Sequence, residues 1–250
     1  MSIEIEVCNI VKHLGSTQAL AGVSTLFKAQ LMHGLIGPEG AGKTTLLRHI
    51  AGLLHPETGE IKFRKKINVD QSSAQETRSV SFNEIRPHIS YMPQQPCLYP
   101  DLSIEEHLDF FKSLYDLSDD EYHIKKDHLL KITRLGDFLD RPARKLSGGM
   151  YKKLGLMCAL ISSPSVLLLD EPTNGVDPIS RREFWDLLYQ LHHQGILIIL
   201  ATAYMDEAER CTEVHLINNG KILKTGEPKK LLLDSGNTSF NNFFIEFVGH

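Results

Sequence analysis

The segment from Gly37 to Thr44, Gly-Pro-Glu-Gly-Ala-Gly-Lys-Thr, constrains this chain more than any other feature. It fits the pattern G-x-x-x-x-G-K-[ST], follows an apolar stretch at 31–36 and opens an amphipathic stretch at Lys43–Leu54. Glycines at these positions let successive backbone N–H groups turn inward around a phosphate at a helix N-terminus, where the helix dipole favours an anion. The segment therefore predicts a strand, a phosphate-binding loop and a helix, in that order.

This loop supplies most of the candidate ligand-binding residues. Lys43 is expected to reach the β and γ phosphates of a nucleotide, and the Thr44 hydroxyl is expected to bind a Mg²⁺ ion beside them. A nucleoside triphosphate with Mg²⁺ is therefore the predicted ligand. The candidate nucleotide-binding residues here are Gly37, Pro38, Glu39, Gly40, Ala41, Gly42, Lys43, Thr44 and Thr45.

A second candidate group is a pair of carboxylates that follows an apolar run, Val166–Asp170 with Glu171 next to it. Ligands of open α/β sheets gather at the carboxyl ends of the strands, which is where this pair would lie. Asp170 suits a hold on Mg²⁺, and Glu171 suits a general base for an attacking water. Alone, such a pair is more often a strand end that meets water; beside a phosphate loop it indicates hydrolysis.

A second glycine turn follows about a hundred residues after the first, at Leu146–Met150. Ser147, Gly148 and Gly149 before a helical stretch predict another anion-binding helix start. An isolated Ser-Gly-Gly is usually no more than a serine-capped helix. Because one nucleotide does not need two such devices from one chain, the second is expected to serve a neighbouring chain.

Strands and helices alternate through the second half of the chain, which predicts an α/β fold with a mixed, mainly parallel sheet. Strand patterns at 3–11, 20–27 and 31–36 predict an N-terminal antiparallel β lobe. Ser103 with Glu106 predicts a capping box that opens an inserted helical lobe at about 101–150. The other expected elements are a strand pair or exposed loop at 64–86, a buried strand at Val166–Asp170, a helix at Pro178–His193, a buried strand at Gly195–Ala201, a hairpin at Glu213–Ile222 and a helix after Leu233.

Within the helical lobe, apolar residues are expected to share one helix face: Leu108, Phe111, Leu114 and Tyr115. Phe184 and Trp185 are expected to pack in the core. The basic clusters are expected on solvated faces: Lys62–Lys66, Lys152 with Lys153, and Lys229 with Lys230.

Composition excludes several classes of protein. The 250 residues predict one large domain or two lobes, and 42% hydrophobic with 23% charged residues is typical of a globular protein. A net charge of -4 gives no general attraction to nucleic acid. The longest apolar run, Ile196–Ala201, is too short to span a bilayer. No secretory signal is expected at the N-terminus. The four separated cysteines and the histidines show no spacing typical of metal ligands, and a reducing cytosol fits the cysteines.

The order of the segments GPEGAGKT, YMPQ, LSGGM, VLLLDEP and NGVDP resembles the nucleotide-binding subunit of ATP-binding-cassette transporters over about residues 3–235, with 236–250 as a C-terminal tail. The resemblance implies the P-loop NTPase fold, ATP and Mg²⁺ as cofactors, and ATP hydrolysis. Arg141–Leu160 and the segment GVDPISRREFW look closest to the exporter branch, whose permeases are of the ABC-2 type and which includes two-cassette multidrug export ATPases.

The resemblance also implies roles for single residues. Gln94 would touch Mg²⁺ and the attacking water and sense the permease, whereas Gln95 is one step out of register. Thr44, Gln94 and Asp170 would then be the metal ligands. Ser147, Gly148 and Gly149 would bind the γ-phosphate held by a partner cassette, so hydrolysis implies a head-to-tail dimer. Asp177 would lie on the loop that joins the two sites.

This chain departs from the family pattern at two important places. Ala203 stands where the family usually has a histidine that contacts the γ-phosphate, and Leu14 stands where an aromatic residue stacks on adenine. A methyl group cannot stabilise developing charge, so slow turnover at the chain's own ATP site is expected. Loose adenine binding is expected as well. Met150 replaces the commoner glutamine of the signature, a change that the exporter branch tolerates.

The resulting hypothesis is an ATPase subunit that drives a separate export permease, as one of two unequal cassettes in the cytoplasm at the inner face of the plasma membrane. One alternative is a regulatory cassette that binds ATP without hydrolysing it. Another is a soluble cassette protein that acts on ribosomes or DNA, which the charge balance disfavours.

Overall fold

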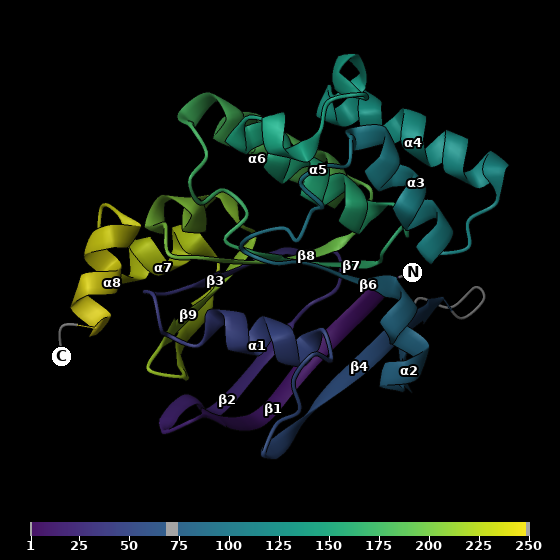
Figure 1. The fold of residues 1–250 in the computed structure, drawn as a ribbon. Coiled ribbons are helices and arrows are strands. Elements are labelled where there is room, and N and C mark those ends of the chain that lie inside the picture. The colour runs from purple at the N-terminus through teal and green to yellow at the C-terminus, as the bar shows by residue number, and fades with distance from the viewer. Residues whose placement is uncertain (1, 69–74, 249–250) are drawn as a thin grey trace.

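A four-stranded antiparallel sheet forms the lower part of the molecule in Figure 1. The computed structural model describes residues 2–68 and 75–248. The sheet has the strand order β2-β1-β4-β5, and its inward side chains, such as Ile5, Ile10 and Phe27, are fully buried. The strands are β1 (Ser2–Leu14), β2 (Thr17–Phe27), β4 (Thr58–Asn68) and β5 (Gln75–Val80).

The second sheet has six strands in the order β10-β9-β3-β8-β7-β6, and all its neighbours are parallel except the β9–β10 hairpin. Asn219 and Gly220, both with positive φ, form the turn of that hairpin. β3, β7 and β8 are buried at every position, as expected of strands covered on both faces. The strands are β3 (Met32–Ile36), β6 (Ile89–Met92), β7 (Val166–Asp170), β8 (Leu197–Thr202), β9 (Glu213–Asn218) and β10 (Lys221–Gly226).

Helix α1 (Lys43–Ile50) lies between the two sheets, and longer helices cover the other face of the six-stranded sheet (Figure 1). Leu46 and Leu47 of α1 belong to the same buried cluster as Ile5 and Leu168, so one apolar core joins the two sheets. The remaining α-helices are α2 (Phe82–Ile85), α3 (Ile104–Leu114), α4 (Asp119–Thr133), α5 (Gly148–Leu160), α6 (Pro178–His193), α7 (Pro228–Ser235) and α8 (Phe240–Val248). Short 3-10 turns are η1 (Arg86–His88), η2 (Gly136–Phe138), η3 (Ala143–Lys145) and η4 (Met205–Arg210).

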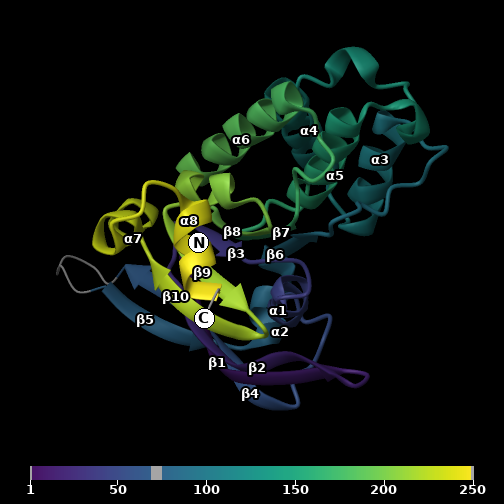
Figure 2. The same cartoon turned by 90° about the vertical axis from the view of Figure 1, so that its left-hand side faces the viewer.

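The structure confirms the predicted α/β fold with a mixed, mainly parallel sheet, an antiparallel β lobe and helices between 104 and 160. The strand expected at 31–36 is not part of that lobe, because β3 pairs in parallel with β8 and β9 in the six-stranded sheet. The capping box at Ser103 and Glu106 is present, because each side chain accepts the other's backbone N–H. Phe184 and Trp185 are buried as expected. The C-terminal part also forms helices, and Figure 2 shows α7 and α8 near the edge formed by β9 and β10. The domain boundaries at 235 and at 101–150 stay predictions.

Several predictions about element ends and burial are wrong. The helix from Lys43 ends at Ile50 rather than Leu54, because Gly52 with positive φ turns the chain. The strand expected from Gly195 begins at Leu197, since Gly195 also has positive φ. In α3, Leu108 is buried but Leu114 is 61% exposed. The two shifted ends therefore follow from glycines with positive φ, whereas the exposure of Leu114 shows that helical periodicity alone does not mark where packing stops.

β4 and β5 form a strand pair in the polar region at 64–86, and residues 69–74 of that region lie outside the described residues. All four cysteines are free thiols. Of the helices in the described ranges, none is long and apolar enough to cross a membrane.

Candidate nucleotide-binding site

The phosphate loop leaves β3 at Gly37 and enters α1 at Lys43. Two of its glycines are required by close packing. A Cβ on Gly37 would lie 2.1 Å from the Ile217 carbonyl oxygen, and a Cβ on Gly42, whose φ is +105°, would lie 2.5 Å from the Ala19 carbonyl oxygen. The loop is therefore pressed against the hairpin and the β lobe, which fixes its shape before any ligand binds.

Lys43 lies across the mouth of this loop. Its ammonium donates to the carbonyl oxygens of Gly37 (2.8 Å) and Pro38 (2.9 Å), and it lies 3.7 Å from a Glu171 carboxylate oxygen. Burial lowers the pKa of Lys43, although Glu171 and Asp170 act in the opposite direction. The anionic oxygens of a phosphate in the loop would accept stronger hydrogen bonds from this ammonium than two neutral carbonyl oxygens do. Lys43 would therefore bind such a phosphate in preference to the carbonyls.

Thr44 and Asp170, the two predicted metal ligands from distant segments, are in direct contact. The Thr44 hydroxyl donates to Asp170 Oδ1 at 3.0 Å, and the Tyr91 hydroxyl donates to Asp170 Oδ2 at 3.0 Å. Burial, followed by the nearby Asp170 charge, raises the pKa of Tyr91 to about 12, so this phenol stays a neutral donor at physiological pH. Hydroxyl and carboxylate oxygens are the hard ligands that Mg²⁺ prefers, so the residues present fit that ion.

Glu171 is held by side chains from two segments. Its Oε2 accepts hydrogen bonds from the Gln94 amide and from the Asn174 amide, both at 2.9 Å. Its own backbone has a φ of +45°, which is uncommon for a residue with a side chain. The strained backbone and the two amides together aim the carboxylate at Lys43, at the edge of the cleft where an attacking water would lie.

Lys152 is a correction to the expected solvated lysine pair. It is buried, and its ammonium donates to the carbonyl oxygens of Gln94 and, at 3.3 Å, of Glu171. Its neighbour Lys153 is also buried and pairs with Glu183 at 2.6 Å. The helix therefore turns both lysines inward, and Lys152 connects the Gln94 segment to the end of β7.

A cleft of about 520 Å³ opens above the phosphate loop. Leu14, at the end of β1, lines it together with Glu39, Lys43, Gln94 and Glu171. Leu14 is 47% exposed. An aliphatic side chain thus stands at the entrance of the cleft, in the place predicted to face the base.

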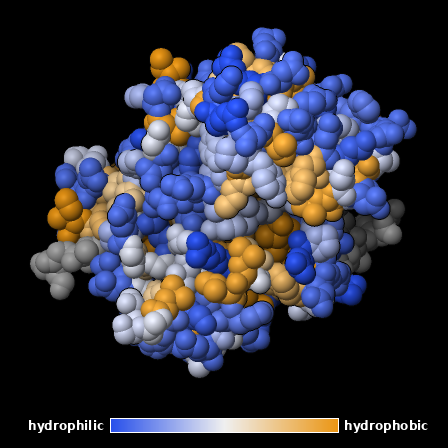
Figure 3. Space-filling view, in the orientation of Figure 1, coloured by the Kyte–Doolittle hydropathy of each residue, from blue (hydrophilic) through white to orange (hydrophobic). Residues whose placement is uncertain are grey.

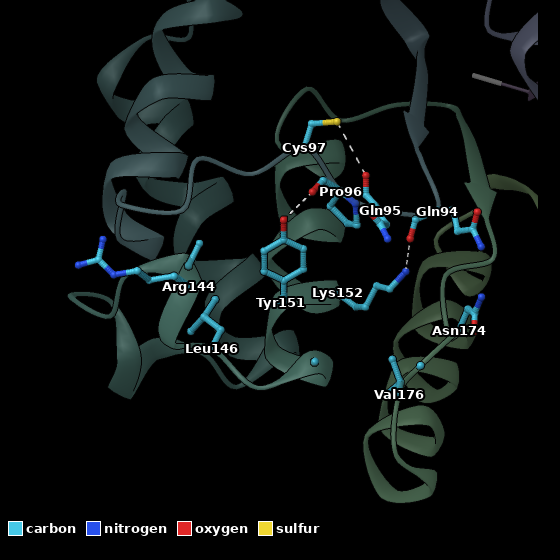
Figure 4. Close-up of a pocket in the computed structure, with 13 residues that line it drawn as sticks. Gln94, Gln95, Pro96, Cys97, Arg144, Leu146, Tyr151, Lys152, Asn174 and Val176 are labelled. Carbon is cyan, nitrogen blue, oxygen red and sulfur yellow. Dashed lines mark hydrogen bonds between the residues drawn. The ribbon is translucent and has the colours of Figure 1, made fainter.

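The second glycine turn lies outside this cleft. Ser147 is the N-cap of α5, and its hydroxyl accepts from the Met150 N–H at 3.3 Å. Gly148 lines a separate cleft of about 750 Å³ that Figure 4 shows, with Arg144, Leu146 and Tyr151 on one side and Asn174 and Val176 on the other. Gln94 and Gln95 line it as well, so Gln94 lies between the two clefts. Asp177, the N-cap of α6, accepts from the N–H groups of Ile179 and Ser180.

The end of β8 lacks a polar side chain at Ala203. Gly37 N–H donates to the Thr202 carbonyl oxygen at 3.3 Å, and Tyr204 N–H donates to the Thr202 hydroxyl at 3.0 Å. The Tyr204 hydroxyl donates to Asn174 at 3.3 Å. The backbone around Ala203 is therefore anchored on both sides, and only the side chain at that position lacks hydrogen-bonding capacity.

The structure brings together the phosphate loop, Asp170, Glu171 and Gln94, and it leaves Ser147–Gly149 elsewhere. Sequence reasoning missed three polar residues in contact with this group, Tyr91, Asn174 and Lys152. Tyr91 is the first residue of the segment YMPQ and Asn174 is the first residue of NGVDP, so their place in those motifs could have identified them. No pattern distinguishes Lys152 from a solvated lysine.

Comparison with known proteins agrees with this site. A family model described as "ABC transporter" matches residues 20–174. The chain is 42% identical over 222 residues to "Probable multidrug ABC transporter ATP-binding protein YbhF" of Escherichia coli (strain K12), which covers 89% of this chain but 37% of that protein. It is 34% identical to "Nod factor export ATP-binding protein I" of Burkholderia lata, over 91% of this chain and 72% of the relative.

Solved structures agree as well. A structure of the ATP-binding subunit of an ABC transporter superposes with a TM-score of 0.79 at 28% identity, covering 97% of this chain and 98% of the other. The present chain spans little more than a third of the first of these relatives, so it corresponds to one part of that longer protein. The matched segment contains the phosphate loop, Gln94, the Ser-Gly-Gly turn and the Asp-Glu pair, so this chain belongs to the ABC transporter family as an ATP-binding cassette.

Proposed function

We propose that this cassette binds ATP with Mg²⁺ and hydrolyses it to drive a separate export permease. The observation that carries the proposal is the convergence of Lys43, Glu171 and Gln94 at the cleft, beside the contact between Thr44 and Asp170. Lys43 would hold the β and γ phosphates, Thr44 and Asp170 would hold Mg²⁺ with Gln94, and Glu171 would take a proton from the attacking water. The metal would neutralise charge on the phosphates.

Hydrolysis in this proposal needs a second cassette. Among the described residues that line the phosphate-loop cleft, none comes from Ser147–Gly149, whereas Gly148 lines the other cleft. A helix N-terminus with free N–H groups is an anion site that the chain's own nucleotide does not use. A head-to-tail arrangement would place it over the partner's γ-phosphate. The partner cassette could be identical, fused or separate, and the longer relative YbhF is consistent with the fused case.

An exposed apolar surface supports docking of a membrane partner. Figure 3 shows apolar side chains across the middle of this face, between the helices above and the strands below. A hollow of about 660 Å³ is lined by Leu53 (60% exposed) after α1, Pro87 of η1 and Tyr115 (43% exposed) at the end of α3. Exposed apolar side chains around a hollow are typical of interaction sites. An ABC-2 type permease docked there would hold the cassette at the inner face of the membrane.

The chain's own ATP site is proposed to turn over slowly. Ala203 provides no donor to the γ-phosphate, and Leu14 provides no aromatic ring for the base. The chain would then supply Ser147, Gly148 and Gly149 to a more active site on the partner. Two unequal sites would result, of which this chain carries the slower.

Two variants test this proposal, because they separate ATP binding from assembly. Gly148 has space for a side chain, since its nearest Cβ contact is 3.5 Å, and a carboxylate suits a helix N-terminus. Gly148→Asp should therefore fold and bind ATP, yet fail to dimerise because its charge would face the partner's γ-phosphate. Lys43→Ala should lose ATP binding itself.

Light scattering with Mg²⁺ and ATP, in a Glu171→Gln background that slows hydrolysis, measures assembly, and calorimetry measures binding. An ATP-dependent dimer that Gly148→Asp abolishes supports the proposal. It is wrong if the parent gives no heat with ATP, or if Gly148→Asp dimerises as well as the parent.

Ala203 also favours a second function, a regulatory cassette that holds ATP without hydrolysing it. The contacts of Glu171 with Gln94 and Asn174 argue against it, since a carboxylate with no catalytic role would not need this positioning. Steady-state phosphate release from the parent chain, compared with Glu171→Gln, distinguishes the two functions.

A further inference from the structure

Three side chains that can ligate a metal meet at the amino ends of β3 and β9, at the opposite end of β3 from the phosphate loop. His33 and His215 are fully buried, and Glu213 is the first residue of β9. Nδ1 of His33 lies 3.0 Å from Nε2 of His215 and 3.5 Å from Oε2 of Glu213. The three ligand atoms all lie within 4.8 Å of one another. The cluster is independent of the nucleotide site.

The spacing of these atoms fits a tetrahedral ion. Metal–nitrogen and metal–oxygen bonds of about 2.0 to 2.1 Å place neighbouring ligand atoms about 3.3 Å apart in a tetrahedron. The separations of 3.0 and 3.5 Å lie on either side of that value. Small side-chain shifts would therefore admit an ion among the three atoms.

The outer ring nitrogens already have the partners that metal-binding histidines need. Nε2 of His33 lies 3.0 Å from the Lys28 carbonyl oxygen, which can only accept, so this nitrogen carries the proton and Nδ1 has a free lone pair. Nδ1 of His215 lies 2.7 Å from the Thr25 hydroxyl and 3.3 Å from the Thr225 hydroxyl. A hydroxyl both donates and accepts, so it can serve either tautomer of His215.

This amphoteric contact lets the cluster change from a metal-free to a metal-bound form without releasing a proton, with the hydrogen bond between the two histidines replaced by their bonds to the ion. Without metal, Nε2–H of His215 donates to Nδ1 of His33, and the Thr25 hydroxyl donates to Nδ1 of His215. With metal, the His215 proton moves to Nδ1 and is donated to the threonine oxygen. Both histidines then offer bare nitrogens to the ion, and no net proton is released.

Glu213 provides the least satisfied atom of the cluster. Its Oε1 accepts from the Lys28 ammonium at 2.8 Å, whereas its Oε2 is buried without a hydrogen-bond partner. A buried carboxylate oxygen without a partner is costly, and a cation beside it would remove that cost. The Glu213 side chain is 12% exposed and that of Lys28 is 53% exposed, so an ion could enter past them.

The two imidazoles are held rigid and uncharged. Phe27 of β2 packs against both rings, with centroids 5.4 Å from His33 and 4.6 Å from His215. Burial lowers the pKa of both histidines, so they are neutral at physiological pH, as metal ligands must be. Because Thr25 and Phe27 belong to the four-stranded sheet, an ion here would tie the β lobe to the six-stranded sheet.

We propose that His33, Glu213 and His215 form a binding site for a borderline transition-metal ion, with Zn²⁺ as the ion of choice for two imidazoles and one carboxylate. The ion would be structural. It would stabilise the junction of the two sheets because it would bind the folded chain and not the unfolded one.

The experiment uses the full chain after dialysis against a chelator, without nucleotide. Calorimetry with ZnCl₂ measures affinity and stoichiometry, the absorption of Co²⁺ in the visible range reports a tetrahedral site, and thermal unfolding reports stabilisation. Glu213→Gln is the main variant, because it keeps the shape of a partly exposed ligand. His215→Gln is the second. Controls are Glu209→Gln, which changes an exposed carboxylate four positions before Glu213 in the sequence, and Cys97→Ser, which changes the exposed thiol.

The parent should bind one Zn²⁺ per chain and unfold at a higher temperature with it. Glu213→Gln should weaken binding at least tenfold, as expected for loss of a ligand, and the two controls should not. The proposal is overturned if the parent gives no heat with excess Zn²⁺. It is equally overturned if only Cys97→Ser removes binding, or if Glu213→Gln and His215→Gln, folded by circular dichroism, bind as tightly as the parent.

Discussion

Strands β7 and β8 lie side by side in register, with Asp170 opposite Ala201, yet their carboxyl ends are differently equipped. β7 ends in Asp170 and leads into Glu171, and both carboxylates are hydrogen bonded to side chains from other segments. β8 leads into Ala203, which has only a methyl group. In the proposed mechanism, β7 would thus supply the group that activates a water, and β8 would supply no group that stabilises charge on the γ-phosphate.

The lack of such a group after β8 does not arise from a distorted backbone. Thr202 accepts from Gly37 N–H through its carbonyl and from Tyr204 N–H through its hydroxyl, so the end of β8 is fixed beside the phosphate loop. Ala203 is only partly buried, and its backbone is already held in position, so a larger side chain could be added there. In the proposed mechanism the two strands would therefore make two different contributions to ATP hydrolysis, and single substitutions can test each of them.

The largest effect is expected at the end of β7, from Glu171→Gln. The glutamine keeps the shape and the contacts with Gln94 and Asn174 but cannot accept a proton from water. Loss of a general base should slow hydrolysis by about 10² to 10⁴. Single-turnover release of labelled phosphate with excess protein measures even a slow parent rate.

The control is Glu209→Gln, which changes an exposed carboxylate and should leave the rate unchanged. If Glu171→Gln releases phosphate as fast as the parent, the carboxylate at the end of β7 has no part in hydrolysis. The proposed difference between the ends of β7 and β8 would then be wrong.

The next effect is expected at the end of β8, from Ala203→His. A positioned donor to the transition state is worth about 2.7 to 4 kcal/mol, which corresponds to a rate gain of about 10² to 10³. Steady-state ATPase activity of the isolated chain measures it. Both sites of a dimer of this chain carry Ala203, so neither masks the gain.

Ala203→Leu is the matched control, because it adds bulk without a donor and should not raise the rate. The gain from Ala203→His should also disappear in the Glu171→Gln background, since residues that act on one transition state are not additive. A chain that gains nothing from Ala203→His would refute the proposal of a slow site caused by the missing donor.

The same contrast explains how far the sequence predicts this molecule. The phosphate loop and β7 are each one continuous stretch of sequence. In each of them, residues that are neighbours in the sequence act together on the ligand, so their types and spacing follow from that chemistry. Gly37–Thr44 and Val166–Asp170 could therefore be predicted as a phosphate loop and a buried strand, whereas the direct contact of Thr44 with Asp170 at 3.0 Å was not predicted. The missing polar side chain at Ala203, after β8, could be recognised only by comparison with a family pattern.

The remaining features depend on tertiary packing. Lys152 is buried because α5 turns that face toward the end of β7, and the sequence offers only two adjacent lysines. His33 and His215 stand 182 positions apart and meet only because β3 and β9 pair in parallel. Ligand spacing in the sequence cannot reveal such a cluster, since two strands with a long connection bring the residues together.

The smallest effect is expected from Leu14→Tyr, which sharpens the comparison by acting on binding alone. Leu14 lies at the rim of the cleft and is 47% exposed, so a ring fits without disturbing the core. Stacking of an aromatic ring on the base should strengthen ATP binding by about 1 to 3 kcal/mol. Calorimetry with Mg²⁺ and ATP measures the change, and turnover at saturating ATP should stay as in the parent.

Inorganic tripolyphosphate is the control ligand for Leu14→Tyr, because it has the three phosphates and no base. Its affinity should not change in the variant, whereas Lys43→Ala should weaken both ligands alike. Equal strengthening of ATP and tripolyphosphate would mean that the residue at the end of β1 acts on the phosphates rather than on the base. Leu14→Tyr and Ala203→His would then alter the same step, and binding and hydrolysis would no longer be separable between β1 and β8.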